Sequence, residues 1–297
     1  MIDATYRYEL RNRYRFKGKL VMQTPLHIGG GKATLSYSDS PVVLTPDRIP
    51  FIPGSSFKGA LRSTVEKLVS GLSDVTGLRS CGLIELSEES LKEAKARSNN
   101  SDICPTIRQW DIQQRRRNAT PKEEEEITKE IYESLCHTCE LFGSPFAASR
   151  INVSDLYMPK KEWHGVLEVR DGVAIDRDSE KAKDRLKYDF EVVPASATFD
   201  LEISLENATT VDLQLISIGL SEFVRGFGAI GGKRSRGLGV CRLTDLTVSS
   251  LVLTDLNKDE HKKRLRDYLL RGSFSEENIP GEQFFARYIE GADGIFK

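Results

Sequence analysis

The stretch over residues 226–239 combines two residue types that bind phosphate. It is rich in glycine, contains the cations Lys233, Arg234 and Arg236, and has no acidic residue. Glycine lets backbone N–H groups approach a ligand closely and adopts positive φ easily, while lysine and arginine supply positive charge. The stretch is therefore predicted to bind a phosphate group, and the alternative is a flexible surface loop.

The spacing Gly226-x-Gly228-x-x-Gly231 matches the dinucleotide-binding fingerprint, which requires a strand before the glycines and a helix after them. The apolar pattern predicts the reverse order, with a helix over 210–225 and a strand over 238–248. A P-loop is excluded because arginine follows the lysine where serine or threonine is required. A Rossmann-type nucleotide site is therefore not expected.

A second candidate is a metal site built from four cysteines in one weakly apolar segment. They are Cys81, Cys104, Cys136 and Cys139. The last two have C-x-x-C spacing, and four thiolates form a closed tetrahedral zinc site that would stabilise a segment with little core of its own. Alternatives are His137 replacing one thiolate, a redox pair, and four unrelated buried cysteines. Cys241 lies on a predicted strand and is expected in the core.

The start of a predicted helix over 55–71 is a third candidate. Ser55 or Ser56 can cap this helix, and Lys58 and Arg62 lie four residues apart on one face of it. A helix N-terminus favours anions, and two cations strengthen that preference. The alternative is an ordinary solvated helix face.

His27 and Asp39 are the remaining residues of chemical interest. His27 ends a predicted strand beside three glycines, and a histidine alone is interpreted as structural. Asp39 lies in a polar loop, Ser-Asp-Ser-Pro, where composition alone favours an Asx turn before proline. No spacing in the chain predicts a Ser–His–Asp or Cys–His catalytic arrangement.

The bulk composition limits the classes of protein that fit. A chain of 297 residues, 39% hydrophobic, can bury the core of one large domain or two small ones. No run of 18 apolar residues predicts a membrane span, and the N-terminus lacks a signal-peptide core, so a cytoplasmic protein is expected. The net charge of −1 argues against a general polyanion binder. Basic patches over 7–19 and 225–242 favour a nucleic-acid binder with a defined footprint.

The elements that must position these residues follow from hydrophobic periodicity. Strands are predicted over 14–28, 150–158, 196–205 and 238–248, and helices over 55–71 and 210–225. Their order, βαββαβ, predicts an α+β protein with a ferredoxin-like or RRM-like arrangement. Helical pieces are also expected over 87–97 and 121–135, and one or two amphipathic helices in the tail. The aromatic sheet face of ordinary RRMs is missing, so backbone contacts are expected to dominate RNA binding.

Several segments together resemble the RAMP superfamily, specifically the backbone subunit of type III CRISPR effector complexes. The matching segments span most of the chain in the family's order: 26–31, 39–42, 49–62, 139–143, 170–177 and 226–239. The long cysteine-containing insertion and the segment over 188–194 are closer to a III-D-like branch of that family.

The resemblance implies a hand-like subunit with an RRM-like palm, a fingers region formed by the insertion that carries the candidate zinc site, and a thumb. The implied domains are a first palm half (1–72), fingers (73–149), a palm strand (150–158), a thumb (159–195), a second palm half with the glycine-rich loop (196–250) and a C-terminal helical extension (251–297).

The resemblance also implies a function. Such subunits hold a CRISPR RNA together with other copies or paralogous backbone subunits and further subunits, and base pairing selects the target RNA. Asp39 falls on the family's catalytic aspartate, and the implied chemistry is Mg²⁺- or Mn²⁺-dependent attack by an RNA 2′-hydroxyl on the adjacent phosphate. The implied RNA-binding residues are His27, Gly30, Ser55, Lys58, Arg62, Arg225, Gly228, Gly231, Lys233, Arg234 and Arg236. Two alternatives are a purely structural RNA-binding subunit and a small-molecule phosphate-binding enzyme.

Overall fold

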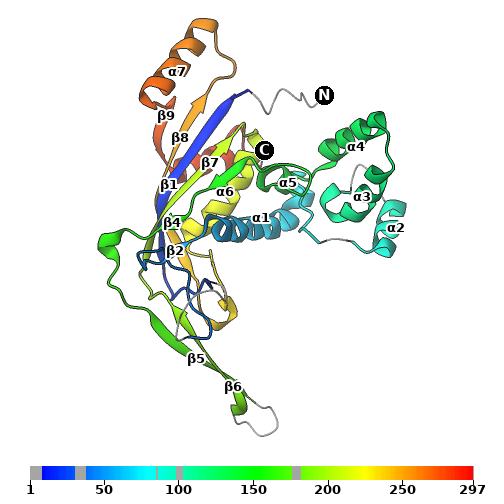
Figure 1. Cartoon of the computed structure of the whole chain (residues 1–297). Coiled ribbons are helices and arrows are strands. Elements are labelled where there is room, and N and C mark those ends of the chain that lie inside the picture. The colour runs from blue at the N-terminus through cyan, green and yellow to red at the C-terminus, as the bar shows by residue number, and fades with distance from the viewer. Residues whose placement is uncertain (1–8, 31–37, 85, 98–102, 176–181, 297) are drawn as a thin grey trace.

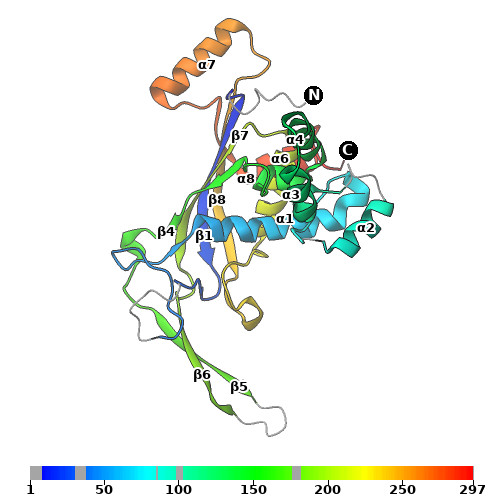
Figure 2. The same cartoon turned by 45° about the vertical axis from the view of Figure 1, so that its right-hand side comes forward.

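The protein consists of a sheet-based body from which three parts project, as Figures 1 and 2 show. The computed structural model describes residues 9–30, 38–84, 86–97, 103–175 and 182–296. Two of the segments that resemble the RAMP superfamily end outside the described residues. These ends are Gly31 in the segment 26–31, and Asp176 and Arg177 in the segment 170–177.

The body is built on one five-stranded sheet in which every pairing is antiparallel. Its strands, in spatial order, are β3 (Ile151–Val153), β7 (Thr198–Glu206), β1 (Asn12–Met22), β8 (Cys241–Val252) and β9 (Glu276–Pro280). Side chains of β1 alternate across the sheet, so Phe16 and Leu20 are fully buried while Lys17 and Lys19 lie on the other face. The mixed α+β class expected from the sequence is confirmed.

Three helices cover the buried face of the sheet: α1 (Gly54–Thr76), α6 (Thr210–Arg225) and α8 (Gly281–Ile289). Gly219 lets α1 and α6 approach closely, because a Cβ at this position would lie 2.6 Å from a methyl group of Val65. The rings of Phe57 and Phe223 meet across the same interface with centroids 5.1 Å apart. A capping box at Thr209 fixes the start of α6 at the predicted residue.

Asp155 explains two corrections to the sequence predictions, one at the start of α1 and one in the strand over 150–158. No serine caps α1; instead the N–H of Gly54 donates to the Asp155 carboxylate at 2.8 Å. The chain bends at this aspartate, so the predicted strand divides into β3 and β4 (Leu156–Tyr157). β4 leaves the main sheet and pairs with β2 (Phe51–Ile52), directly before α1.

The ends of the body also differ from the predictions. The first strand ends at Met22 rather than residue 28, although Leu26 makes an isolated bridge to Val193. The tail was expected to be helical only, but β9 lies between α7 (Lys258–Arg271) and α8. β9 has no buried side chain, so apolar alternation could not indicate it; its pairing with the edge of β8 makes it a strand.

The insertion between α1 and β3 forms the helical lobe that projects to one side in Figure 1. Its elements are α2 (Glu88–Arg97), the 3₁₀ helix η3 (Pro105–Arg108), α3 (Gln109–Arg117), α4 (Pro121–Ser134) and α5 (His137–Phe142). Two of these helices match the predicted pieces, and α3 and α5 were not predicted. The residues of the lobe that the structure describes form two small apolar clusters, one of which contains the cysteines.

The other two projections are a β-hairpin and a helix. Strands β5 (Glu168–Ile175) and β6 (Ala182–Val192) form a hairpin that points away from the body at the bottom of Figures 1 and 2. Helix α7 extends from the opposite end and buries none of its side chains. Among the described helices, none has the length and apolar character that crossing a membrane demands.

Candidate functional site

Asp39 is exposed and is joined to the root of the hairpin by two hydrogen bonds. Its backbone N–H donates to Oδ1 of Asp189 at 2.7 Å, and the backbone N–H of Asp189 donates to Oδ2 of Asp39 at 3.1 Å. The carboxylate thus binds a strand 150 residues away rather than its own turn. We call this reciprocal pair the Asp39–Asp189 clasp.

Successive residues of β6 bind two different loops. Asp189 and Glu191 face the loop that carries Asp39: the Glu191 carboxylate accepts a hydrogen bond from the N–H of Val42 at 3.1 Å. Tyr188 and Phe190 face the glycine-rich loop. Because side chains alternate along a strand, one short segment of β6 connects the two loops.

His27 holds three segments together at this point. Its ring nitrogens lie 2.7 Å from the carbonyl oxygen of Glu191 and 3.3 Å from Oγ of Ser40, and its own carbonyl accepts from the N–H of Gly232 at 2.9 Å. The side chain is buried. These contacts agree with the structural interpretation of a lone histidine, and its assignment to RNA binding stays a prediction.

The glycine-rich loop is packed against the body, and three of its glycines have steric reasons. Gly231 has φ +84°, and a Cβ there would lie 2.4 Å from the carbonyl oxygen of His27. At Gly239 a Cβ would lie 2.0 Å from the carbonyl oxygen of Ile230, and at Gly228 it would lie 2.3 Å from the Phe223 ring. The glycines therefore permit close packing within the protein, whatever ligand the loop binds.

The cations of this loop have different environments. Lys233 Nζ lies 4.4 Å from the centroid of the Phe190 ring, and Arg236 donates a hydrogen bond to the hydroxyl of Tyr188. Arg234 is exposed, and no hydrogen bond or ion pair of its side chain is found within the described part of the chain. Arg225 is exposed at the end of α6.

Near the start of α1, the predicted cations contact protein groups. Lys58 Nζ donates to Oγ of Ser149 at 2.7 Å and to the carbonyl of Ile151 at 3.1 Å. Burial, with the nearby charge of Arg62, lowers the pKa of Lys58. Ser55 is exposed in the first turn of α1, and in the second glycine cluster Gly30 donates its N–H to Pro41 at 2.9 Å. The RNA-binding roles of these residues stay predictions.

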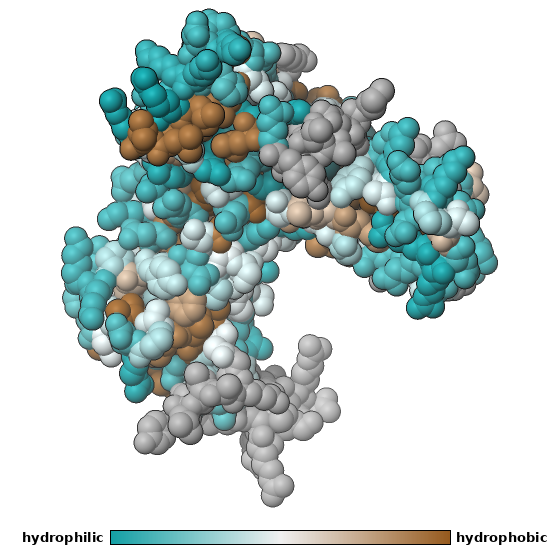
Figure 3. Space-filling view, turned by 45° about the horizontal axis from the view of Figure 1, so that its top comes forward, coloured by the Kyte–Doolittle hydropathy of each residue, from teal (hydrophilic) through white to brown (hydrophobic). Residues whose placement is uncertain are grey.

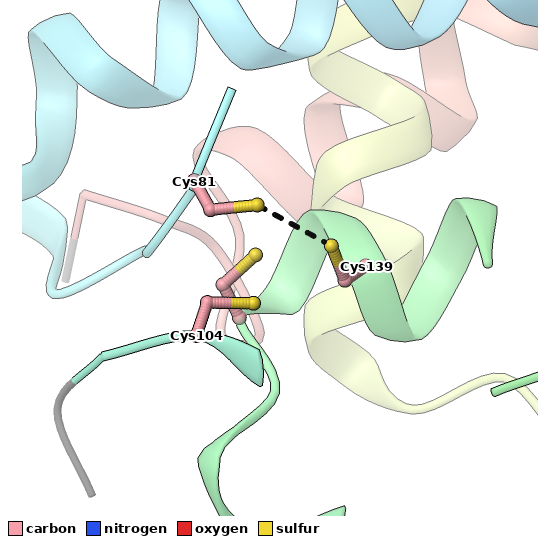
Figure 4. Close-up of side chains that lie close together, drawn as sticks. Cys81, Cys104 and Cys139 are labelled. Atoms are coloured by element: carbon pink, nitrogen blue, oxygen red, sulfur yellow. Dashed lines mark hydrogen bonds between the residues drawn. The ribbon is translucent and has the colours of Figure 1, made fainter. Parts of the chain in front are cut away.

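The four cysteines of the insertion come together. Figure 4 shows Cys81, Cys104 and Cys139 pointing toward one another from separate segments. With Cys136, all four sulfur atoms lie within 4.8 Å of one another, and three of the residues are buried. Within the described residues this is the one group of three or more His, Cys, Asp or Glu side chains placed to hold a metal ion.

Neighbouring groups complete the environment of the cysteines. Arg62 donates to the sulfur of Cys139 at 3.3 Å, and the hydroxyl of Thr106 lies 3.1 Å from the same sulfur. Hydrogen bonding among the thiols, from Cys136 above all, lowers the pKa of Cys104. His137, the alternative ligand, instead accepts a hydrogen bond from the N–H of Arg79 at 3.0 Å and lies outside the cluster.

Two long-range contacts of these sites could not be inferred from the sequence, one made by Arg62 and one by Asp189. Arg62 donates to the sulfur of Cys139 and to the carbonyl of Gly143 at 2.8 Å, and its predicted RNA-binding role stays a prediction. Asp189 lies too far along the chain from Asp39 for any spacing pattern to pair them. The buried position expected for Cys241 is confirmed, with no exposed surface.

The fold and these sites define an α+β protein in which a glycine-rich basic loop and an exposed aspartate contact the same segment of β6. The sequence model of the RAMP superfamily matches residues 19–242, and the chain belongs to that superfamily.

Three curated relatives named CRISPR system Cms endoribonuclease Csm3 are similar to parts of the chain. The protein from Enterococcus italicus is 49% identical over 59 residues, which cover 19% of this chain and 28% of the relative. The protein from Methanothermobacter thermautotrophicus is 37% identical over 79 residues, 26% of this chain and 32% of the relative. The protein from Streptococcus thermophilus is 41% identical over 59 residues, 19% and 27% respectively. Each match thus spans less than a third of the relative's length.

Proposed function

We propose that the chain is a CRISPR RNA-binding backbone subunit of a type III effector complex that cleaves target RNA with Asp39. The observation that carries this proposal is the position of Asp39 in a RAMP protein: exposed, held by the hairpin root, and linked through β6 to the glycine-rich loop. The names of the three partial relatives support the endoribonuclease activity. Its partners are CRISPR RNA, target RNA and further backbone and effector subunits.

The strand order supports a ferredoxin-like palm. The four predicted strands are β1, β3, β7 and β8, in chain order. Numbered 1 to 4 in that order, they lie side by side in the sheet as 2-3-1-4, and a helix follows strands 1 and 3. We propose that the helical lobe is the fingers and the β5–β6 hairpin the thumb. The III-D-like subtype stays a prediction, since the relatives carry the name of the Cms system.

The proposed reaction needs little from the protein besides placement of one carboxylate. The RNA 2′-oxygen bonds to the adjacent phosphorus, the bond from phosphorus to the 5′-oxygen breaks, and a cyclic phosphate and a 5′-hydroxyl result. Oδ2 of Asp39 accepts from Asp189, and Oδ1 has no hydrogen bond in the described residues. Oδ1 is thus available to orient the hydroxyl or to bind Mg²⁺ or Mn²⁺. Such a cation, bound by one or two carboxylates and by substrate phosphates, would stabilise charge on the phosphate.

The four-cysteine cluster fits a structural Zn²⁺ ion. Tetrahedral zinc with Zn–S bonds of about 2.3 Å holds its sulfurs about 3.8 Å apart. The sulfurs of Cys81 and Cys139 lie 3.5 Å apart, and all four fall within 4.8 Å. All four thiols are free rather than paired as disulfides. Cys81, Cys104, Cys136 and Cys139 would ligate the ion as thiolates and hold the base of the fingers together.

Replacement of Asp39 tests the proposed activity. In a complex assembled with Asp39→Ala, we expect target cleavage to fall by about 10²-fold or more, because a positioned catalytic group typically contributes that much. Guide and target binding should persist, since the exposed side chain is one contact among many. Asp47→Ala is the matched control, because Asp47 is an exposed loop aspartate whose ion pair with Lys160 is long, at 3.8 Å. Undiminished cutting at every site would reject the catalytic role.

The alternative without cleavage also has an observation in its favour. Both the backbone and the carboxylate of Asp39 are used in the clasp, which is sufficient reason for an aspartate at this position. If Asp39→Ala leaves cleavage intact but the complex still binds guide RNA, this structural function is correct. A small-molecule phosphate enzyme would instead bind mononucleotides with weak salt dependence.

A further inference from the structure

We propose that Asp189 is the positioning residue for Asp39, fixing both the backbone and the carboxylate orientation needed for cleavage. The inference rests on the proposed endoribonuclease function and adds a residue to its site. Asp189 acts through Asp39 and does not itself contact the RNA.

The clasp fixes Asp39 at two points. An acceptor for the Asp39 N–H alone would leave the carboxylate free to rotate, and a donor to the Asp39 carboxylate alone would leave the loop free to shift. Asp189 supplies both partners: its carboxylate binds the Asp39 N–H at 2.7 Å, and its own N–H binds Oδ2 of Asp39 at 3.1 Å. The exposed carboxylate is therefore held with Oδ1 free for substrate.

The end of β6 that carries Asp189 is itself firmly held. Phe190 and Val192, which follow Asp189 on the opposite face of the strand, are buried. Val193 exchanges two backbone hydrogen bonds with Leu26 at 2.8 and 2.9 Å. Rigid support matters because a displacement of about 1 Å in a catalytic group can cost about 10²-fold in rate. An exposed loop residue without such support would sample several rotamers.

Loss of the Asp189 side chain should act locally. The loop keeps its neighbouring attachments: the N–H of Glu191 donates to the carbonyl of Ser40 at 3.1 Å, and Val42 donates to the Glu191 carboxylate. Asp189→Ala thus frees the Asp39 backbone without detaching the whole loop. This separates a positioning role from a general role in folding.

The two carboxylates suggest a contrasting explanation, in which the charge of Asp189 acts directly on a cation or on the RNA. Asparagine separates the two explanations, because its side-chain oxygen still accepts a hydrogen bond but carries no charge. Positioning by hydrogen bonding predicts that Asp189→Asn cleaves nearly as well as the natural protein. Direct action by charge predicts that Asp189→Asn is as defective as Asp189→Ala.

The experiment compares assembled type III complexes containing the natural chain, Asp39→Ala, Asp189→Ala, Asp189→Asn or Asp200→Ala. Asp200 is an exposed strand aspartate opposite Lys19 that takes no part in the hydrogen bonds of the clasp, and it serves as control. We expect Asp189→Ala to lower the single-turnover cleavage rate about 10²-fold with unchanged target affinity, and Asp189→Asn to restore most of it. A natural rate for Asp189→Ala, equal defects in both variants, or parallel loss of target affinity would each overturn the proposal.

Hydrogen exchange supplies a readout that does not depend on cleavage. The Asp39 amide should exchange faster in Asp189→Ala and stay protected in Asp189→Asn, and unchanged exchange in Asp189→Ala contradicts the clasp. Full activity of Asp39→Ala would reject the proposed catalysis, and the positioning role in cleavage with it. The exchange result would still show whether Asp189 orders this loop, so the two failures are distinguishable.

Discussion

The cysteine cluster and the Asp39–Asp189 clasp join distant segments in opposite ways. The cluster is largely buried and uses four side chains of one type within a single insertion. The clasp is at the surface, links residues 150 apart, and uses a main-chain N–H in each of its hydrogen bonds. A side-chain cluster leaves a signature of residue types in the sequence, whereas a main-chain contact leaves almost none. The predictions below test whether the two also differ in what they contribute: folding in one case, placement in the other.

The largest expected effect comes from removing two cysteines of the proposed zinc site in the helical lobe. Changing Cys136 and Cys139 together to Ser should abolish zinc binding, whose apparent free energy in small structural sites is about 10 kcal/mol or more. The helical lobe should then lose protection from proteolysis while the sheet body remains folded, because the apolar clusters formed by the described residues of the lobe are small. Metal analysis of purified protein and limited proteolysis measure both.

Cys241→Ser is the control for that pair, because Cys241 is equally buried but lies in the sheet. It should keep one zinc ion per chain. A purified natural chain without zinc, or zinc retained after both cysteines are changed, contradicts the assignment.

An intermediate effect is expected from crowding at the glycine-rich loop. Gly231 and Gly237 both have positive φ, +84° and +79°. A Cβ at Gly231 meets the His27 carbonyl at 2.4 Å, while a Cβ at Gly237 meets nothing within 4 Å. We expect Gly231→Ala to lower the free energy of unfolding by about 3 kcal/mol and Gly237→Ala by about 1 kcal/mol. Urea unfolding checks this, and equal losses would show that backbone strain alone requires these glycines.

Hydrophobic periodicity predicted the strands and helices whose own sequence places apolar residues on one face. The alternation of Phe199, Leu201 and Ile203 identified β7, and the apolar face of the helix over 210–225 identified α6 with its correct bounds. The capping of α1 could not be predicted, because its acceptor is Asp155, a hundred residues later. Strand β9 was missed because edge pairing rather than alternation makes it a strand.

The candidate sites show the same difference between local sequence patterns and long-range contacts. The cysteine quartet was predicted from residue type and C-x-x-C spacing, and the structure brings it together. Lys58 and Arg62 fit an anion site in the sequence, since a cation near a helix start is the same pattern whether it faces RNA or protein. The structure shows them in contact with Ser149 and Cys139, and their RNA-binding roles stay predictions. Asp189 could not be predicted, because only the folded chain brings it to Asp39.

The smallest effect should distinguish two cations of the glycine-rich loop, Arg234 and Arg236. Arg234 is exposed with its charge available, whereas Arg236 donates to the hydroxyl of Tyr188 at the hairpin root, one residue from the clasp. A phosphate contact releases counterions, so Arg234→Ala should reduce the slope of log affinity against log salt by about 0.7 for single-stranded RNA. Arg236→Ala should leave that slope nearly unchanged and loosen the hairpin root instead.

Guide-RNA binding by the full chain over a salt series measures the slopes, and hydrogen exchange in β6 measures the loosening. If both variants lower the slope equally, both cations bind phosphate, and the loop does not divide its charges between the RNA and the hairpin that carries the clasp.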